Sequence, residues 1–310
     1  MRLCGFDISR GEKRDVAIPV FGGEHLDATL FCGAQPGKTL VMTAGVHGCE
    51  YNGIEALRIL RHELNPAQLC GQVVLVPLVN ASGFYKGTKQ LVPEDGVNLN
   101  RAFPGDADGS YSARLAATTE QLLYPDADLL IDLHGGDVNE MAMAFAYFPA
   151  DAEPTVSARA RAAAAALSLP YRVASSAKNG LYSWAAQQGI PALLLERGGR
   201  GGWSTDEVNA YRRNVYELLN HLDILSGAFP VPAQKEIEQA VYIEAGHQGF
   251  WYPAVREGQA VPKGAVLGEL RDYDGAQIRV YYADYDGVTL YYTVALGVQA
   301  GDPLIAYGKL

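Results

Sequence analysis

The sequence predicts an α/β fold, in which a mostly parallel or mixed sheet is covered by helices on both faces and followed by a small all-β domain. Two observations carry this prediction. Continuous apolar runs of strand length alternate with stretches of helical spacing as far as about residue 230. Beyond that point, short strand-like runs alternate with glycine-containing turns, and no stretch reads convincingly as a helix. We therefore expect two domains, at 1–230 and 231–310.

The expected elements follow one another in a regular order. The first is a hairpin formed by 15–20 and 27–34 around the turn sequence GGEH. Four apolar runs then read as buried strands: 39–46, 72–80, 127–134 and 191–196. Helices are expected at 54–64, 155–168 and 204–225. Because ligands of such sheets bind beyond the carboxyl ends of the strands, the residues that follow these runs are the first candidates for a site.

Charge and composition exclude several classes of partner. The net charge is −10 and there is no run of Lys and Arg, which argues against nucleic acid. No stretch approaches the roughly 18 consecutive apolar residues of a membrane helix, and the N-terminus lacks the apolar core of a signal peptide, so we expect a cytoplasmic protein. The four cysteines form no CxxC pair, which predicts free thiols.

Two of the six histidines directly follow predicted strands. His47 comes after 39–46, and His134 ends the apolar run at 127–134. Glu50 lies three residues after His47, where the chain turns into a helix, so its carboxylate can face the same point. Two histidines and one glutamate are a known catalytic zinc set that leaves one position for water. Each could be an ordinary polar loop residue, but their joint placement favours one metal site.

A further acid, Glu196, ends the apolar run at 191–196 and leads into the sequence RGGRGG. The glycines there allow the backbone to approach a ligand closely. A carboxylate that is not itself a metal ligand is well placed to take a proton from an activated water and pass it to a leaving amine. The alternative is that Glu196 is merely a charge at the end of a strand.

The loop 94–105 contains no obvious regular element, and long loops in compact domains are more often functional than idle. Arg101 in this loop offers a planar guanidinium that matches a carboxylate, and Asn100 could add a donor beside it. A surface ion pair is the competing interpretation of Arg101.

Four motifs, taken in order, resemble the succinylglutamate desuccinylase/aspartoacylase family of the zinc carboxypeptidase superfamily. They are HGCE at 47–50, NLNRAFPG at 98–105, DLHGG at 132–136 and LLLERGG at 193–199. The HxxE pattern alone would be weak, but the four motifs together with the β domain cover nearly the whole chain. The resemblance implies a carboxypeptidase-like α/β domain and a lipoyl-like β-barrel extension that narrows access to the metal, which favours small substrates.

The same resemblance implies roles for individual residues. His47, Glu50 and His134 are expected to bind one Zn²⁺ ion per chain. Glu196 is expected to be the general base, and Asn100 with Arg101 is expected to grip a carboxylate of the substrate.

Two positions depart from the family's pattern. Relatives often carry an arginine upstream of the NLNR loop that polarises the scissile carbonyl, whereas this stretch offers Lys86 and Lys89, of which Lys89 is our candidate. Where relatives often have an aspartate that supports a zinc histidine, this chain has Asn98, which gives the imidazole less basicity. Asp132, two residues before His134, is another candidate for such support, unless it is a plain strand-end acid.

The predicted function is therefore a zinc-dependent deacylase that cleaves the amide bond of a small N-acylated substrate carrying a carboxylate. Desuccinylase, aspartoacylase and diamino acid deacetylase activities all remain open, as does assembly into a homo-oligomer. One alternative is a zinc carboxypeptidase acting on small peptides. An alternative of another class is a non-catalytic binding protein whose metal site is a relic, but the intact ligand set together with Glu196 counts against it.

Overall fold

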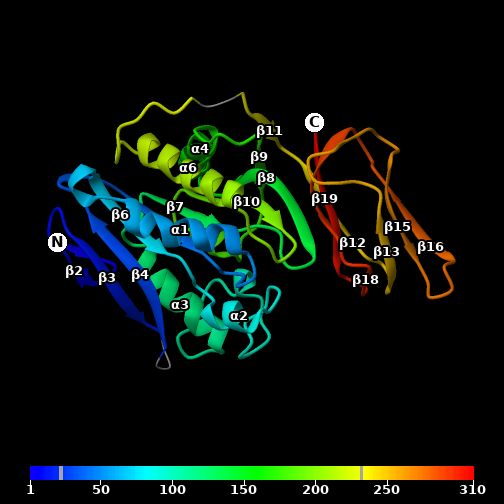
Figure 1. The fold of residues 1–310 in the computed structure, drawn as a ribbon, viewed down its shortest axis with the longest axis horizontal. Helices are drawn as coiled ribbons and strands as arrows, with labels where there is room; N and C mark the ends of the chain where they lie inside the picture. The colour runs from blue at the N-terminus through cyan, green and yellow to red at the C-terminus, as the bar shows by residue number, and fades with distance from the viewer. Residues whose placement is uncertain (21–23, 231–232) are drawn as a thin grey trace.

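The computed structural model describes residues 1–20, 24–230 and 233–310. Its main feature is a 13-stranded mixed sheet, beside which a four-stranded antiparallel sheet lies at the C-terminal end of the molecule (Figure 1). The described helices are α1 (Tyr51–Glu63), α2 (Ala81–Lys86), α3 (Tyr111–Leu123), α4 (Pro154–Ala165), α5 (Leu181–Gln187) and α6 (Thr205–His221), with 3₁₀ turns η1 (Pro66–Gln68) and η2 (Leu99–Arg101).

The described strands divide between the N-terminal and C-terminal parts of the chain. The first group is β1 (Arg2–Leu3), β2 (Phe6–Asp7), β3 (Lys13–Pro19), β4 (His25–Cys32), β5 (Gln35–Ala44), β6 (Cys70–Val76), β7 (Leu129–Leu133), β8 (Glu140–Pro149), β9 (Tyr171–Ser175) and β10 (Ala192–Gly199). The second group is β11 (Lys235–Ile237), β12 (Ala240–Glu244), β13 (Gly249–Pro253), β14 (Ala260–Val261), β15 (Val266–Arg271), β16 (Gln277–Tyr282), β17 (Gly287–Thr293), β18 (Gly297–Val298) and β19 (Pro303–Lys309).

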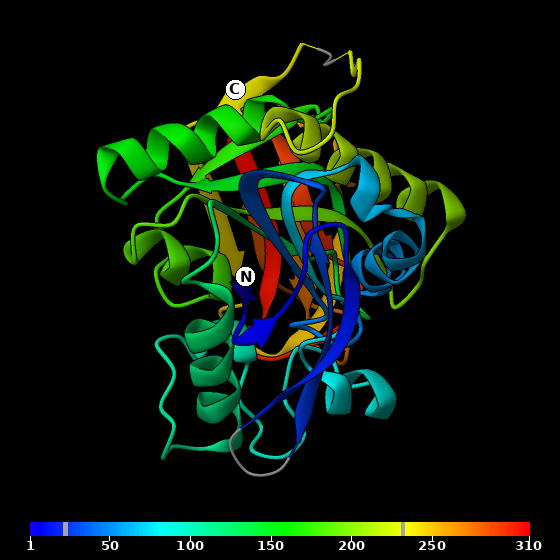
Figure 2. The same cartoon turned by 90° about the vertical axis from the view of Figure 1, so that its left-hand side faces the viewer.

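Four adjacent strands, in the order β6-β5-β7-β10, form the parallel centre of the large sheet. Each of them overlaps one of the four predicted apolar runs, although the strand bounds differ from those of the runs. Alternate side chains point to opposite faces: Met42 packs with α1 and α6, whereas Val41 packs with α3 and α5. Figure 2 shows α1 and α6 on one side of the sheet and α3 on the other. The predicted layer of helices on each face is confirmed.

Antiparallel strands flank this parallel centre. On one side β4 pairs with β6 and then with β3, and on the other β8 pairs with β10. The sheet is therefore mixed. The sequence analysis does not predict β8, α3 or α5. The stretch EMAMAFAYFP that forms β8 is rich in Ala and Met, which favour helix over strand. It is a strand because it pairs with β10, β17 and β9 in the sheet.

Residues 233–310 contain strands and no helix among those described, as the sequence predicts. Strands β12, β19 and β17 extend the large sheet through the pairing of β17 with β8, while β13, β15, β16 and β18 form the separate antiparallel sheet. Apolar side chains from both sheets, among them Trp251, Leu270 and Tyr307, pack into one cluster between them. The antiparallel β region is confirmed, whereas the boundary at 230/231 touches residues outside the described ranges and the division into two domains stays a prediction.

Three smaller expectations concern local features. The opening hairpin forms from β3 and β4, but residues 22 and 23 of its GGEH turn lie outside the described residues. All four cysteines are free, as predicted. Within the described ranges, no helix combines the length and the apolar character needed to cross a membrane. The expected cytoplasmic location stays a prediction.

Candidate active site

The ends of three neighbouring strands bring the predicted site residues together. Ala44 of β5 and Leu195 of β10 lie on either side of Leu133 of β7, in register with it. His134 directly follows the end of β7, and Glu196 is the next residue along β10, so both lie directly beyond this row. His47 follows β5 after a short turn. The parallel arrangement thus gathers the candidates at one edge of the sheet.

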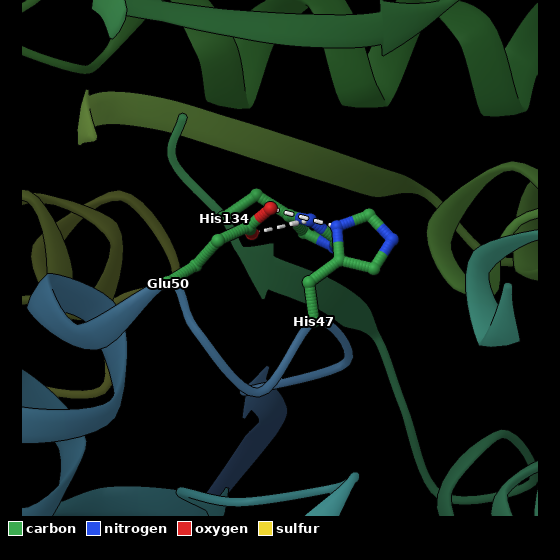
Figure 3. Close-up of side chains that lie close together, drawn as sticks. All are labelled: His47, Glu50 and His134. Atoms are coloured by element: carbon green, nitrogen blue, oxygen red, sulfur yellow. Dashed lines mark hydrogen bonds and ion pairs between the residues drawn. The ribbon is translucent and has the colours of Figure 1, made fainter. Parts of the chain in front are cut away.

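His47, Glu50 and His134 form a compact cluster in which one potential ligand atom from each lies within 4.8 Å of the others. Figure 3 shows the carboxylate of Glu50 reaching both imidazoles. Its Oε1 lies 2.7 Å from Nδ1 of His47, and its Oε2 lies 2.9 Å from Nδ1 of His134. The side chains of Glu50 and His134 are buried.

The loop that carries His47 and Glu50 is held close to α2. A Cβ added to Gly48 would lie 2.2 Å from the backbone nitrogen of Phe84, so only glycine fits at this position of the HGCE motif. On the other side of the cluster, the backbone N–H of Gly135 donates to Oε2 of Glu50 over 3.1 Å. These contacts fix the orientation of the Glu50 carboxylate.

Each imidazole is also held from its far side. Nε2 of His47 lies 3.0 Å from Oδ1 of Asn98, and Nε2 of His134 lies 2.7 Å from Oδ2 of Asp132. The hydroxyl of Thr43 donates to Oδ1 of Asp132 over 2.7 Å. Asp132 is therefore a buried support for His134, and Asn98 performs the same function for His47.

This arrangement fits a metal ion. Because the oxygens of Asn98 and Asp132 accept from Nε2–H, a neutral imidazole presents an unprotonated Nδ1 to Glu50. Each Nδ1 then faces a Glu50 oxygen, at 2.7 Å for His47 and 2.9 Å for His134. Both atoms of each pair are acceptors, so they repel one another unless a proton or a cation lies between them. When the two histidines instead carry the proton, burial still acts to raise the pKa of Glu50, but their charges and hydrogen bonds outweigh it and lower the pKa to about 2, so Glu50 is then a carboxylate. Two nitrogens and a carboxylate are the donor set of catalytic zinc sites.

Glu196 lies on the same cavity, which has a volume of about 860 Å³. Its Oε2 is buried and has no hydrogen-bond partner among the described residues. Burial, reinforced by the charge of Glu50, raises the pKa of Glu196 from 4.5 to about 8. A carboxyl group with this pKa is able both to accept and to release a proton near neutral pH.

Asn100 and Arg101 also line the cavity, although one polar atom of each is already engaged. Oδ1 of Asn100 accepts from the backbone N–H of Leu181 at the start of α5, over 3.0 Å, which leaves its amide N–H₂ to donate. The exposed Arg101 donates to the carbonyl of Asn100 over 2.8 Å, and it forms no ion pair with any described residue. The surface ion pair considered for Arg101 is thus not observed within the described part of the chain.

Lys89 lies apart from this group. Its Nζ is 3.6 Å from Oδ2 of Asp137, and Lys89 is not among the residues that line the cavity, whereas Asp137 is. The structure therefore brings six of the seven predicted site residues onto one cavity and leaves Lys89 beside it. A role for Lys89 in polarising the scissile carbonyl stays a prediction.

The sequence analysis missed several residues of the cavity wall. They are the acids Asp137 and Glu140 and the tyrosines Tyr147, Tyr242 and Tyr291. Asp137 follows His134 closely enough to have been suspected. The tyrosines come from β8, β12 and β17, and Tyr242 hydrogen-bonds to Tyr147 over 3.1 Å. The pairing of β17 with β8 helps to bring these strands together, and no local signal in the sequence reports it.

An α/β sheet that holds a largely buried His-Glu-His cluster and an unpaired carboxyl group on one cavity has the arrangement of metal-dependent hydrolases. Residues 36–222 match the family model described as the succinylglutamate desuccinylase/aspartoacylase catalytic domain. The chain belongs to this family, and it is a hydrolytic enzyme that acts on an amide bond.

Similar proteins agree with this assignment. The N-alpha-acetyl-L-2,4-diaminobutyric acid deacetylase of Halomonas elongata is 32% identical over 287 residues, which cover 88% of this chain and 83% of that protein. The succinylglutamate desuccinylase/aspartoacylase structure from Rhodobacter sphaeroides is 26% identical, with a TM-score of 0.87 over 99% of this chain and 98% of the other. The product-bound ectoine utilization protein EutE (DoeB) of Ruegeria pomeroyi, at 24% identity, has the same fold, with a TM-score of 0.89 over 98% of both chains.

Proposed function

We propose that this protein is a zinc-dependent deacylase that hydrolyses the amide bond of a small N-acyl amino acid. The observation that carries the proposal is the unpaired carboxyl of Glu196, which shares a cavity with the cluster of His47, Glu50 and His134. The Halomonas relative, a deacetylase of N-alpha-acetyl-L-2,4-diaminobutyric acid, supplies the first compound to test.

His47, Glu50 and His134 would hold one Zn²⁺ ion per chain, with Asn98 and Asp132 fixing the two rings. A bound zinc ion supplies Lewis acidity, which makes water a nucleophile near neutral pH and polarises a carbonyl. The buried supports are part of this assignment, because hydrogen bonds to the far nitrogen of a metal-binding imidazole orient the ring and raise its basicity.

Glu196 would act as the proton carrier. Its raised pKa allows it to take a proton from the attacking water and then return that proton to the nitrogen of the leaving amine. The guanidinium of Arg101 and the free N–H₂ of Asn100 would bind the substrate carboxylate, so that the amide is presented to Glu196.

The cavity wall favours small substrates over peptides. Residues of β12, β17 and β19 line it together with residues of the parallel sheet, so the C-terminal strands form part of the enclosure. Comparing acyl amino acids with dipeptides therefore separates the proposed deacylase from a carboxypeptidase with the same chemical groups.

The decisive variant is Glu196→Gln, which keeps the shape of the side chain but cannot carry the proton. In zinc-loaded protein we expect turnover of N-acetyl-2,4-diaminobutyrate to fall by roughly 10²- to 10⁴-fold while one zinc ion per chain remains bound. Asp274→Asn, which neutralises an exposed acid in the turn between β15 and β16, is the matched control and should behave as wild type. Near-normal turnover in Glu196→Gln would reject the assigned role. A zinc-loaded wild type that hydrolyses no acyl amino acid would reject the proposed function.

A further inference from the structure

A buried tyrosine of α6 contacts the backbone that carries two of the site residues. The side chain of Tyr211 is fully buried, and its hydroxyl donates to the carbonyl oxygen of His134. The carbonyl oxygen of Leu195 lies 3.2 Å from the same hydroxyl. His134 follows the end of β7, and Leu195 precedes Glu196 on β10. Tyr211 therefore contacts both strands at the point where they present His134 and Glu196 to the cavity.

The contact continues through one peptide unit to Glu50. The carbonyl of His134 and the N–H of Gly135 belong to the same peptide, and this N–H donates to Oε2 of Glu50 over 3.1 Å. Because a peptide unit is planar, a hydrogen bond that fixes its carbonyl oxygen also fixes the direction of its N–H. A donor at the carbonyl further polarises the peptide and strengthens the bond that its N–H donates. The orientation of Glu50 is thus linked to the hydroxyl of Tyr211.

This peptide depends on such contacts because two glycines follow His134. Neither Gly135 nor Gly136 has a side chain whose packing could fix the backbone. A Cβ added to Gly135 would lie 2.5 Å from the carbonyl oxygen of Arg197, so the close approach of the two strands excludes a larger residue there. The backbone that presents His134 is therefore permissive, and hydrogen bonds have to select its orientation.

Arg197 holds the ring of Tyr211 in place. Its guanidinium carbon lies 5.1 Å from the centre of that ring. Its Nη1 donates to Oε2 of Glu207 over 3.0 Å, and its Nη2 donates to Oδ1 of Asn214 over 3.2 Å. Glu207, Tyr211 and Asn214 lie at helical spacing on one face of α6, so one guanidinium attaches this face to β10. The proposed chemistry leaves Arg197 of the LLLERGG motif without a role, and this contact supplies one.

We propose that Tyr211 is a positioning residue that acts through the His134–Gly135 peptide on the carboxylate of Glu50, and that Arg197 keeps its ring in position. This inference rests on the proposed function, in which Glu50 is a metal ligand. The metal site then has a buried support for its carboxylate as well as for its two imidazoles.

The variant Tyr211→Phe removes the hydroxyl and keeps the ring. We expect the zinc affinity, measured by chelator competition, to fall by roughly 3- to 10-fold, which is the range that one hydrogen bond supports. In zinc-saturated protein, kcat for N-acetyl-2,4-diaminobutyrate should fall by at least about threefold while KM stays within about twofold. This split is expected because the hydroxyl contacts the backbone of the site and not Arg101, the residue proposed to bind the substrate.

Tyr307→Phe is the matched control. Tyr307 is also fully buried, and its hydroxyl accepts from the backbone N–H of Asp284 over 2.9 Å in the C-terminal region. Each variant loses one buried hydroxyl, so we expect a similar loss of stability for both in urea unfolding. Only Tyr211→Phe should change the zinc affinity and kcat.

Arg197→Met tests the part played by the guanidinium. It should lower the zinc affinity by a smaller factor than Tyr211→Phe, and it serves if Tyr211→Phe folds poorly. If Arg197 acts through Tyr211, the double variant should bind zinc within about twofold of Tyr211→Phe alone. Losses that multiply in the double variant would overturn the role of Arg197.

The outcomes separate this inference from the proposed function. Wild-type zinc affinity or wild-type kcat in Tyr211→Phe would overturn the positioning role, and so would an equal loss of zinc affinity in Tyr307→Phe. A raised KM at unchanged kcat would overturn it as well. Wild type that binds zinc but hydrolyses no acyl amino acid would reject the proposed deacylase, while the zinc affinities would still decide the role of Tyr211. Failure of wild type to bind zinc would reject the metal site and this inference with it.

Discussion

The buried carboxyl of Glu196 should make the stability of the metal-free protein fall as the pH rises. Burial and the charge of Glu50 raise the pKa of Glu196 from 4.5 to about 8 in the folded state. In the unfolded chain the side chain is hydrated and ionises near its ordinary value. Between these two pKa values the folded protein holds a proton that the unfolded chain has released, so increasing pH favours unfolding.

The size of the effect follows from the two pKa values. Each unit of difference corresponds to about 1.4 kcal/mol. The interval from 4.5 to about 8 therefore corresponds to at most about 5 kcal/mol, the penalty that ionisation of Glu196 imposes on the folded state. The Glu196→Gln side chain cannot ionise, so this variant does not lose folded-state stability through ionisation at this position. We expect the variant to match wild type near pH 5 and to be more stable by a few kcal/mol near pH 8.5.

Urea unfolding of chelator-treated protein, followed by tryptophan fluorescence between pH 5 and pH 9, measures this difference. Comparing midpoints of wild type and variant at each pH cancels the contributions of other titrating groups. The control Asp274→Asn should show no pH-dependent difference from wild type. A constant difference between wild type and Glu196→Gln across this pH range would refute the reasoning. Added zinc should shrink the difference, because a nearby cation favours the carboxylate.

Three further predictions concern the metal site, the substrate and the core. Asp132→Asn weakens the support of His134 and should lower zinc affinity by roughly 10- to 100-fold in chelator competition; unchanged affinity would show that this hydrogen bond does not tune the metal site. Arg101→Ala should raise KM at least about tenfold with a smaller change in kcat, and the reverse pattern in steady-state kinetics would contradict its role in binding. Leu57→Ala in α1 should cost about 2–5 kcal/mol in urea unfolding, and zinc content should stay at one ion per chain.

The convergence of His47, Glu50, His134 and Glu196 on one cavity could be predicted because its signals are local. His134 and Glu196 each directly follow an apolar run, and His47 with Glu50 lies at the turn from a strand into a helix. In a sheet with a parallel centre, the register of neighbouring strands places such positions at one edge. The runs are apolar because both faces of these strands are covered by helices, and the same burial makes the strands visible in the sequence.

The rest of the cavity wall depends on pairings between distant parts of the chain. Glu140 and Tyr147 lie on β8, whose Ala- and Met-rich sequence does not distinguish strand from helix. Tyr291 reaches the cavity because β17 pairs with β8 at Tyr291↔Ala142. These two strands are far apart in the sequence, and the pattern of residues within either strand does not indicate that they pair. Lys89 shows the limit of a purely local signal: it is near the NLNR loop in sequence, yet it lies beside Asp137 and not among the lining residues, and its role stays a prediction.

The continuity of the large sheet means that substrate recognition cannot be assigned to one half of the chain. Strand β8 carries Glu140 and Tyr147, and it is held between β10, which carries Glu196, and β17 of the C-terminal region. The hydrogen bond between Tyr242 and Tyr147 links the same two regions across the cavity. In the proposed function, chemistry and selectivity are therefore adjacent on one sheet: the parallel centre positions the His-Glu-His cluster and Glu196, and the antiparallel extension forms part of the cavity wall.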